Sequence, residues 1–248
     1  MNYINHFNNE SDKYLVFRPN YPDALYKFLA THVSNRGCVW DCATGSGQAA
    51  LALTNYFDVV LASDINREQL DAAPDHRNVH YLCCAAENTP IQSGSVDLIT
   101  VAQALHWFNF ELFYQEARRV AKPCALIAVW CYSLGHINEA IDPHIEHLYY
   151  DILGDKYWPA ERRFIDEAYQ TIPFPFEKIK TPVFTIEKEL TFKQFIGYLR
   201  TWSAVKEYYA QTKIDPVLQV YDKLHAAWGD VDTHKMHWPL HLLAGRIT

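Results

Sequence analysis

Short apolar runs alternate with segments of helical spacing through the first half of the chain. Apolar runs of strand length are Cys38–Cys42, Val59–Ser63, Val79–Cys83, Val96–Ala102 and Ala125–Tyr132. Helical spacing follows Pro22 and recurs over Gln48–Tyr56, Arg67–Ala73 and Glu111–Val120. Because the runs are apolar without two-residue alternation, they indicate strands buried on both faces. The alternation predicts an α/β fold, a doubly wound and mostly parallel sheet with helices on both sides.

The pattern changes after Tyr132. Residues 137–172 are aromatic and helix-leaning, and 183–190 form an extended run. Thr191 and Gln194 have the spacing of a capping box for a helix over Phe192–Arg200, with more helix through residue 228. Residues 237–247 indicate a last strand. We expect one domain over 1–248, with a core of about 22–135 plus C-terminal strands and a helical, aromatic-rich cap of about 137–172 and 191–230.

Composition narrows the class of protein. Of 248 residues, 49% are hydrophobic and 21% charged, which excludes a disordered chain. The longest apolar run, Cys124–Tyr132, is far shorter than the 18 or so residues of a membrane span. The first residues lack a basic start before an apolar stretch, so we expect no secretory signal and a cytoplasmic protein.

Charge points to a small-molecule partner. The net charge is −7, and no run rich in Lys and Arg interrupts it, which argues against nucleic acid binding. The six cysteines include no C-x-x-C pair, so we expect them reduced. His144 with His147, and His234 with His237 and His241, have spacings that could reach one metal, but no Cys or carboxylate set completes the site. We expect no metal.

The most informative stretch runs from residue 39 to residue 48. An apolar strand ends in Asp41, and a turn containing Gly45 and Gly47 then opens a helix. Glycine lets the backbone approach a ligand closely. Asp64 lies at the end of the second strand, where a carboxylate can accept both hydroxyls of a ribose. Open α/β sheets bind ligands at this carboxyl edge.

Two ligands fit this pattern. Residues 45–50 match the G-x-G-x-x-A form of the dinucleotide fingerprint, which favours a nicotinamide-dependent reductase. A pyrophosphate on that turn, however, would lie near the negative charge of Asp41. S-adenosylmethionine carries an amino group and a sulfonium and has no phosphate, so the charge favours the methyl donor.

The sequence also resembles the class I S-adenosylmethionine-dependent methyltransferases, and within them the subgroup that includes trans-aconitate methyltransferases. The likeness covers nearly the whole chain. Its five segments, in order, are Tyr14 to Pro22, Asp41 to Gly47, Ala86 to Pro90, Val96 to Phe108 and Leu199 to Val205. The resemblance implies a seven-stranded, Rossmann-like sheet.

The resemblance also implies which residues bind S-adenosylmethionine. Asp41 and the backbone of Gly45 and Gly47 would hold the methionyl part, and Asp64 the ribose. Ala43 replaces the first glycine of the family's loop, and Ala85 replaces an acidic residue common in the subgroup. The other donor-site residues implied are Tyr14, Arg18, Ile65, Gln69, Ala86, Glu87 and Gln103.

The acceptor side is less specified. The family points to an oxygen of a small molecule, with carboxylic acids among the expected acceptors. His106 would position the acceptor or act as a base, and Trp107, Arg200 and Trp202 would contact it. Because Ala43 and Ala85 depart from the pattern, a non-catalytic protein that binds the donor or regulates a partner remains an alternative. The oligomeric state is open.

Overall fold

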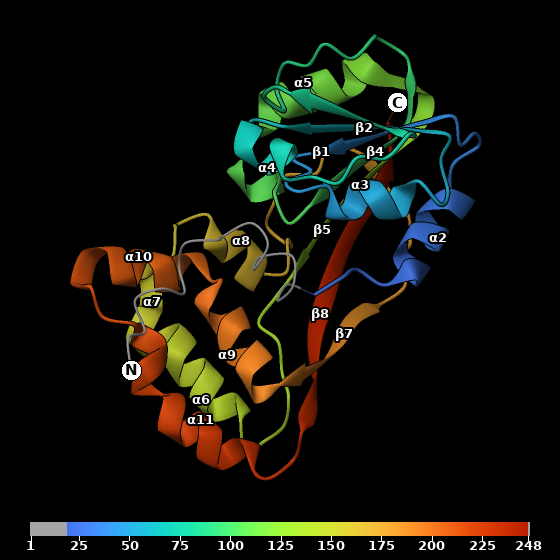
Figure 1. Cartoon of the computed structure of the whole chain (residues 1–248). Coiled ribbons are helices and arrows are strands. Elements are labelled where there is room, and N and C mark those ends of the chain that lie inside the picture. The colour runs from blue at the N-terminus through green and yellow to red at the C-terminus, as the bar shows by residue number, and fades with distance from the viewer. Residues whose placement is uncertain (1–18, 248) are drawn as a thin grey trace. The chain divides into compact units, whose positions relative to one another are not determined.

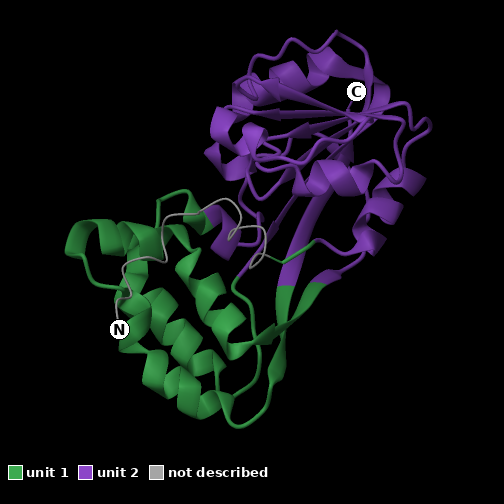
Figure 2. Ribbon diagram, in the orientation of Figure 1, with its two compact units in different colours: residues 1–20, 134–163, 186–238 green, residues 21–133, 164–185, 239–248 purple. Residues whose placement is uncertain are grey.

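The computed structural model describes residues 19–247 (Figure 1). The chain forms two units (Figure 2), which are described one at a time. Unit 2 contains residues 21–133, 164–185 and 239–248, and unit 1 contains 1–20, 134–163 and 186–238. Strands β7 and β8 have residues in both.

The sheet is built as the apolar pattern predicts. Within the described residues it has eight strands, in the order β3-β2-β1-β4-β5-β8-β6, with β7 also paired to β8. The first five strands in this order, β3, β2, β1, β4 and β5, are parallel to one another. Strand β8 is antiparallel to its neighbours β5 and β6. Their bounds are β1 Cys38–Cys42, β2 Val59–Asp64, β3 Val79–Cys83, β4 Val96–Ala102, β5 Ala121–Tyr132, β6 Glu177–Lys178, β7 Phe184–Thr191 and β8 Thr233–Arg246.

Helices cover both faces of the parallel strands in unit 2. Figure 1 shows α3 (Gln48–Leu53) and α5 (Phe110–Val120) on opposite sides of β1, β2 and β4. One core cluster joins the α5 residues Phe113 and Ala117 to Ile99 of β4. The other helical segments here are α2 (Asp23–Thr31), α4 (Arg67–Asp71) and η2 (Leu105–Trp107). The doubly wound, mostly parallel Rossmann-like fold is thus confirmed.

Two details differ from the sequence expectation. The two-residue strand β6 was not expected, because two exposed polar residues carry no periodicity. Residues 164–172, expected with the cap, belong to unit 2. The reason is hydrophobic: Ile165, Tyr169 and Ile172 are buried in the same cluster as Phe113 of α5.

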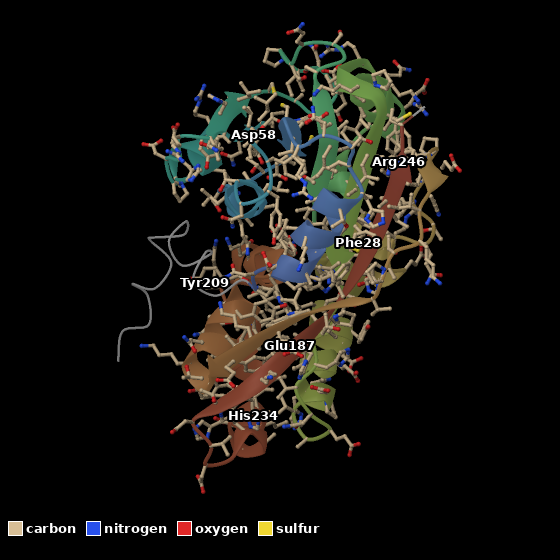
Figure 3. All side chains as sticks on the ribbon, turned by 90° about the vertical axis from the view of Figure 1, so that its right-hand side faces the viewer. Phe28, Asp58, Glu187, Tyr209, His234 and Arg246 are labelled. Atoms are coloured by element: carbon tan, nitrogen blue, oxygen red, sulfur yellow. The ribbon has the colours of Figure 1, made fainter. Side chains whose placement is uncertain are left out.

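Unit 1 is mainly helical. The predicted capping box at α9 is present, since the Gln194 amide donates to Thr191 Oγ1 (3.3 Å) and the Thr191 amide donates to Gln194 Oε1 (2.9 Å). Glu187 of β7, labelled in Figure 3, pairs with Lys235 and His237 of β8. The helices of this region are α6 Asp142–Glu146, η3 His147–Leu153, α7 Gly154–Tyr157, α9 Phe192–Arg200, α10 Ser203–Thr212, η4 Pro216–Gln219 and α11 Tyr221–Trp228. Helix α8 (Arg162–Asp166) has residues in both units.

Two buried acidic side chains of unit 2, Asp97 and Glu116, have basic partners. Lys122 contacts both oxygens of Asp97 at 2.8 Å. Burial raises the pKa of Glu116, but hydrogen bonds from Arg119 and Thr89 outweigh it and bring the pKa to about 2. All six cysteines are free. Among residues 19–247 no helix is long and apolar enough to span a membrane, and no set of three metal-ligating side chains comes together.

Candidate functional site

Asp41 lies at the centre of the predicted edge, near the carboxyl end of β1. Parallel pairing places it opposite Ala62 of β2 and Thr100 of β4. Its side chain is fully buried. Thr44 donates to one carboxylate oxygen at 2.6 Å, and Thr100 donates to the other at 2.8 Å. The carboxylate is therefore fixed, and both its oxygens are already hydrogen-bonded.

The surroundings of Asp41 disfavour its negative charge. Burial raises the pKa of Asp41 to about 6, against the lowering effect of hydrogen bonds from Thr44, Thr100 and the Ala50 amide; the nearby charge of Asp64 adds to the rise. A buried carboxylate of this kind is stabilised by a cation. Residues 41–48 contain no Lys or Arg, so the loop itself supplies no such cation, and a cationic ligand could.

The loop after Asp41 needs left-handed backbone at three positions. Ala43, Gly45 and Gly47 have φ of 54°, 58° and 82°. Such angles favour glycine, so the glycine that the family pattern places at 43 has a conformational reason. A Cβ at Gly47 would also lie 2.6 Å from the Tyr81 hydroxyl oxygen. Two features thus favour glycine at position 47: its positive φ, and the Tyr81 hydroxyl, which a side chain there would displace.

Replacing Gly47 with alanine is expected to destabilise the protein more than the same change at Gly94. Both glycines have positive φ, but a Cβ at Gly94 would meet nothing within 4 Å. The strain of the left-handed angle, roughly 1–2 kcal/mol, is shared by the two variants. Gly47→Ala would also displace the Tyr81 hydroxyl from its hydrogen bond to the Pro74 carbonyl, which costs roughly a further 0.5–1.5 kcal/mol. Denaturant unfolding of the pair measures the difference, and equal free energies of unfolding would contradict the close approach.

Asp64 holds the loop in place. Its Oδ2 accepts the Gly45 amide at 2.8 Å, and its Oδ1 accepts the Asn66 amide at 2.8 Å. A carboxylate has about four acceptor positions. Since only two are used by these amides, Asp64, which is half-buried, can still accept two ligand hydroxyls.

The residues next to Asp64 line the same turn. Ile65 is 76% exposed. The Gln69 side chain approaches the loop, because its Oε1 lies 3.3 Å from where a Cβ on Gly45 would be. The structure thus places Gln69 beside Gly45 and leaves the Ile65 side chain exposed.

Glu87 and Gln103 have structural contacts that the sequence did not reveal. Glu87 accepts the backbone amide of Asn109, the residue that caps α5. The Gln103 side chain pairs with the backbone of Tyr132, accepting its amide at 2.8 Å and donating to its carbonyl at 3.4 Å. Ala86 is buried. Glu87 and Gln103 therefore anchor α5 and β5, whatever they do toward a ligand.

His106 lies in η2, just beyond the carboxyl end of β4. It is 5% exposed, and its Nδ1 lies 2.9 Å from the hydroxyl oxygen of Tyr169. Trp107, the next residue, is 56% exposed. Tyr169 was not predicted as a site residue, because a contact across 63 positions leaves no spacing signal.

The remaining candidate site residues lie either outside the described residues or in unit 1. Tyr14 and Arg18 lie outside the described residues. Within unit 1, Arg200 forms an ion pair with Asp215 at 2.8 Å. Trp202 is 4% exposed and packs against the rings of Tyr149, Trp158 and Tyr198. Their contact with an acceptor stays a prediction.

Comparisons with known proteins agree with this geometry. A family profile described as a methyltransferase domain matches residues 40–129. A Dictyostelium discoideum protein named as a methyltransferase is 33% identical over 247 residues, covering 97% of this chain and 94% of its own. A malonyl-[acyl-carrier protein] O-methyltransferase of Marinomonas is 25% identical over 199 residues, with 73% and 74% coverage.

A solved structure shares the fold over nearly its whole length. It is named as a type II methyltransferase from Anaeromyxobacter dehalogenans, and it is 39% identical, with a TM-score of 0.87 over 93% of this chain and 98% of its own. A buried carboxylate that needs a cation and a second one with acceptor positions to spare suit a donor with an amino group and a ribose. The chain belongs to the S-adenosylmethionine-dependent methyltransferases, enzymes that take S-adenosylmethionine as their methyl donor.

Proposed function

We propose that the protein methylates an oxygen of a small carboxylic acid. The observation that carries the proposal is the contact of His106 Nδ1, next to the end of β4, with the Tyr169 hydroxyl oxygen at 2.9 Å. An imidazole held by a hydrogen bond can orient an acceptor without removing a proton from it. The site therefore suits an acceptor that is already ionised, and a carboxylate is ionised at neutral pH.

On the donor side, the buried carboxylate of Asp41 would bind the ammonium group of S-adenosylmethionine. Asp64 would accept the two ribose hydroxyls in its remaining acceptor positions, and the Gly45 and Gly47 backbone would pass close to the methionyl part. Ile65 would pack on the adenine, since its exposed side chain offers an apolar surface there. These roles follow the family resemblance and agree with the contacts of each residue.

The reaction is an in-line displacement. A carboxylate oxygen forms a bond to the methyl carbon while the bond from that carbon to sulfur breaks, and the electron pair stays on sulfur. The products are a methyl ester and the demethylated donor, and no proton has to be removed. Alignment of the two reactants is then the main task of the protein, and His106 would contribute by hydrogen bonding.

Two likenesses support an acid as acceptor. The Marinomonas relative is named for O-methylation of a malonyl group. Five segments of this chain also resemble trans-aconitate methyltransferases, which methylate a carboxylate. Both are family analogies, and they agree with a positioning role for His106.

The test compares acceptors and His106 variants. Transfer of labelled methyl is measured with panels of small carboxylic acids and of alcohols and phenols. We expect labelled methyl esters that alkali hydrolyses. His106→Ala should lower kcat/KM about 10-fold, His106→Gln should recover part of the loss, and the rate should not rise with pH through the imidazole range.

Other outcomes would contradict the proposal. A loss of about 10²–10⁴-fold in both His106 variants, with a wild-type rate that rises near pH 6.5, would mark general-base catalysis on a hydroxyl. Donor binding without transfer to any acid would favour the non-catalytic alternative.

A further inference from the structure

We propose that Tyr169 is a positioning residue, which holds His106 in the tautomer with its proton on Nε2. The tautomer itself does not depend on the proposed function; only the role of the Nε2 proton, as a donor to the acceptor carboxylate, rests on it. The contact between the two residues is buried, since His106 is 5% exposed and Tyr169 is 1% exposed. Their ring centroids are 6.0 Å apart, and His106 Nδ1 lies 2.9 Å from Tyr169 Oη.

The backbone around Tyr169 is shaped to place this hydroxyl. The Tyr169 amide donates to the Phe164 carbonyl at 2.7 Å, and the Ala168 amide donates to the Ile165 carbonyl at 2.9 Å, which is the bonding pattern of a Schellman motif. Ala168 and Tyr169 have φ of 55° and 59°. Two successive left-handed residues without glycine are a strained arrangement, and strain of this kind concentrates at functional sites.

The direction of the hydrogen bond follows from what surrounds the phenol oxygen. The nearby backbone of Leu105 and His106 lowers the pKa of this phenol, but burial raises it more strongly. Burial raises the pKa of Tyr169 well above its ordinary value, so the phenol keeps its proton. In the part of the chain that the structure describes, His106 Nδ1 is the acceptor in contact with the hydroxyl.

The hydroxyl accordingly donates to Nδ1. A neutral imidazole that accepts at Nδ1 carries its proton on Nε2. His106 then presents an N–H donor on the ring side away from Tyr169, and it has no lone pair there for taking a proton. Such a donor suits an acceptor carboxylate, which it would orient by hydrogen bonding. Tyr169 thus favours a positioning role for His106 over a role as general base.

The test reads the tautomer directly. Long-range ¹H–¹⁵N spectra of uniformly labelled protein distinguish protonated from unprotonated ring nitrogens, and comparison with His106→Gln assigns the His106 signals among the twelve histidines. The wild type should show an unprotonated Nδ1 and a protonated Nε2 at pH 7.5. Tyr169→Phe, which keeps the buried ring, should move both signals toward an average of the two tautomers and lower kcat/KM about 3- to 10-fold.

Tyr114→Phe is the matched control. Tyr114 is also buried in this core, and its hydroxyl donates to the Pro173 carbonyl at 2.5 Å rather than to a histidine. Its removal should leave the His106 signals unchanged. If Nδ1 carries the proton in the wild type, or if Tyr169→Phe leaves the spectrum unchanged, the inference is wrong. The spectrum needs no acceptor, so this outcome is separate from failure of the proposed carboxylate methylation.

Discussion

Replacing Asp64 with alanine is expected to weaken the binding of S-adenosylmethionine by about 10- to 150-fold. A buried hydrogen bond to a charged group contributes roughly 1.5–3 kcal/mol, and 1.36 kcal/mol corresponds to a factor of ten. The carboxylate would hold the ribose hydroxyls, and it also fixes the loop through the Gly45 amide. Calorimetric titration measures the dissociation constant of each variant.

Asp71→Ala is the control for this change. Asp71 ends α4, a few residues from Asp64, and its side chain is exposed. Its loss removes the same charge without touching the loop, so donor affinity should stay within about twofold if only screened surface charge is lost. Unchanged affinity in a folded Asp64→Ala protein would rule out the ribose assignment.

Binding of S-adenosylmethionine is expected to strengthen as the pH rises from 5 to 7. With its pKa near 6 in the free protein, Asp41 is about one-tenth ionised at pH 5 and about nine-tenths at pH 7. A cationic ligand binds the ionised form, so binding releases a proton below pH 6 and the affinity rises with pH. The donor's amino group stays protonated over this range, since the α-amino pKa is about 7.7–8.0. The expected change is about tenfold.

Asp41→Asn separates this effect from other titrations. Asparagine keeps the shape and a hydrogen-bonding side chain between Thr44 and Thr100, but it has no charge. The variant should bind S-adenosylmethionine about 10- to 150-fold more weakly at pH 7 and show a flat profile between pH 5 and 7. A tenfold pH dependence that persists in Asp41→Asn would assign the titration to another group.

The parallel sheet could be predicted from the sequence because its strands are buried on both faces. β1 and β4 are continuous apolar runs whose carboxyl ends carry Asp41 and Gln103, so strand assignment alone brings those residues to one edge. The capping box of Thr191 and Gln194 is likewise local and was predicted correctly. Local signals of this kind depend on residues a few positions apart.

What could not be predicted depends on contacts between distant segments. Tyr169 reaches His106 across 63 positions, and neither its left-handed angle nor its burial leaves a periodic signal. The same holds for Glu87 and Asn109, and for Gln103 and Tyr132. The assignment of residues 164–185 to the sheet unit follows from burial of Ile165, Tyr169 and Ile172 on the α5 side, which an aromatic-rich composition does not distinguish from a cap.

The donor preference of the loop after β1 is the centre of the account, and ligand titration tests it most directly. S-adenosylmethionine, its demethylated product and NAD are titrated into the wild type and into Asp41→Asn by calorimetry. We expect the first two to bind and NAD not to bind, and we expect Asp41→Asn to weaken the binding of both adenosyl ligands. Binding of NAD in place of S-adenosylmethionine, with an affinity that improves when the charge of Asp41 is removed, would contradict this expectation.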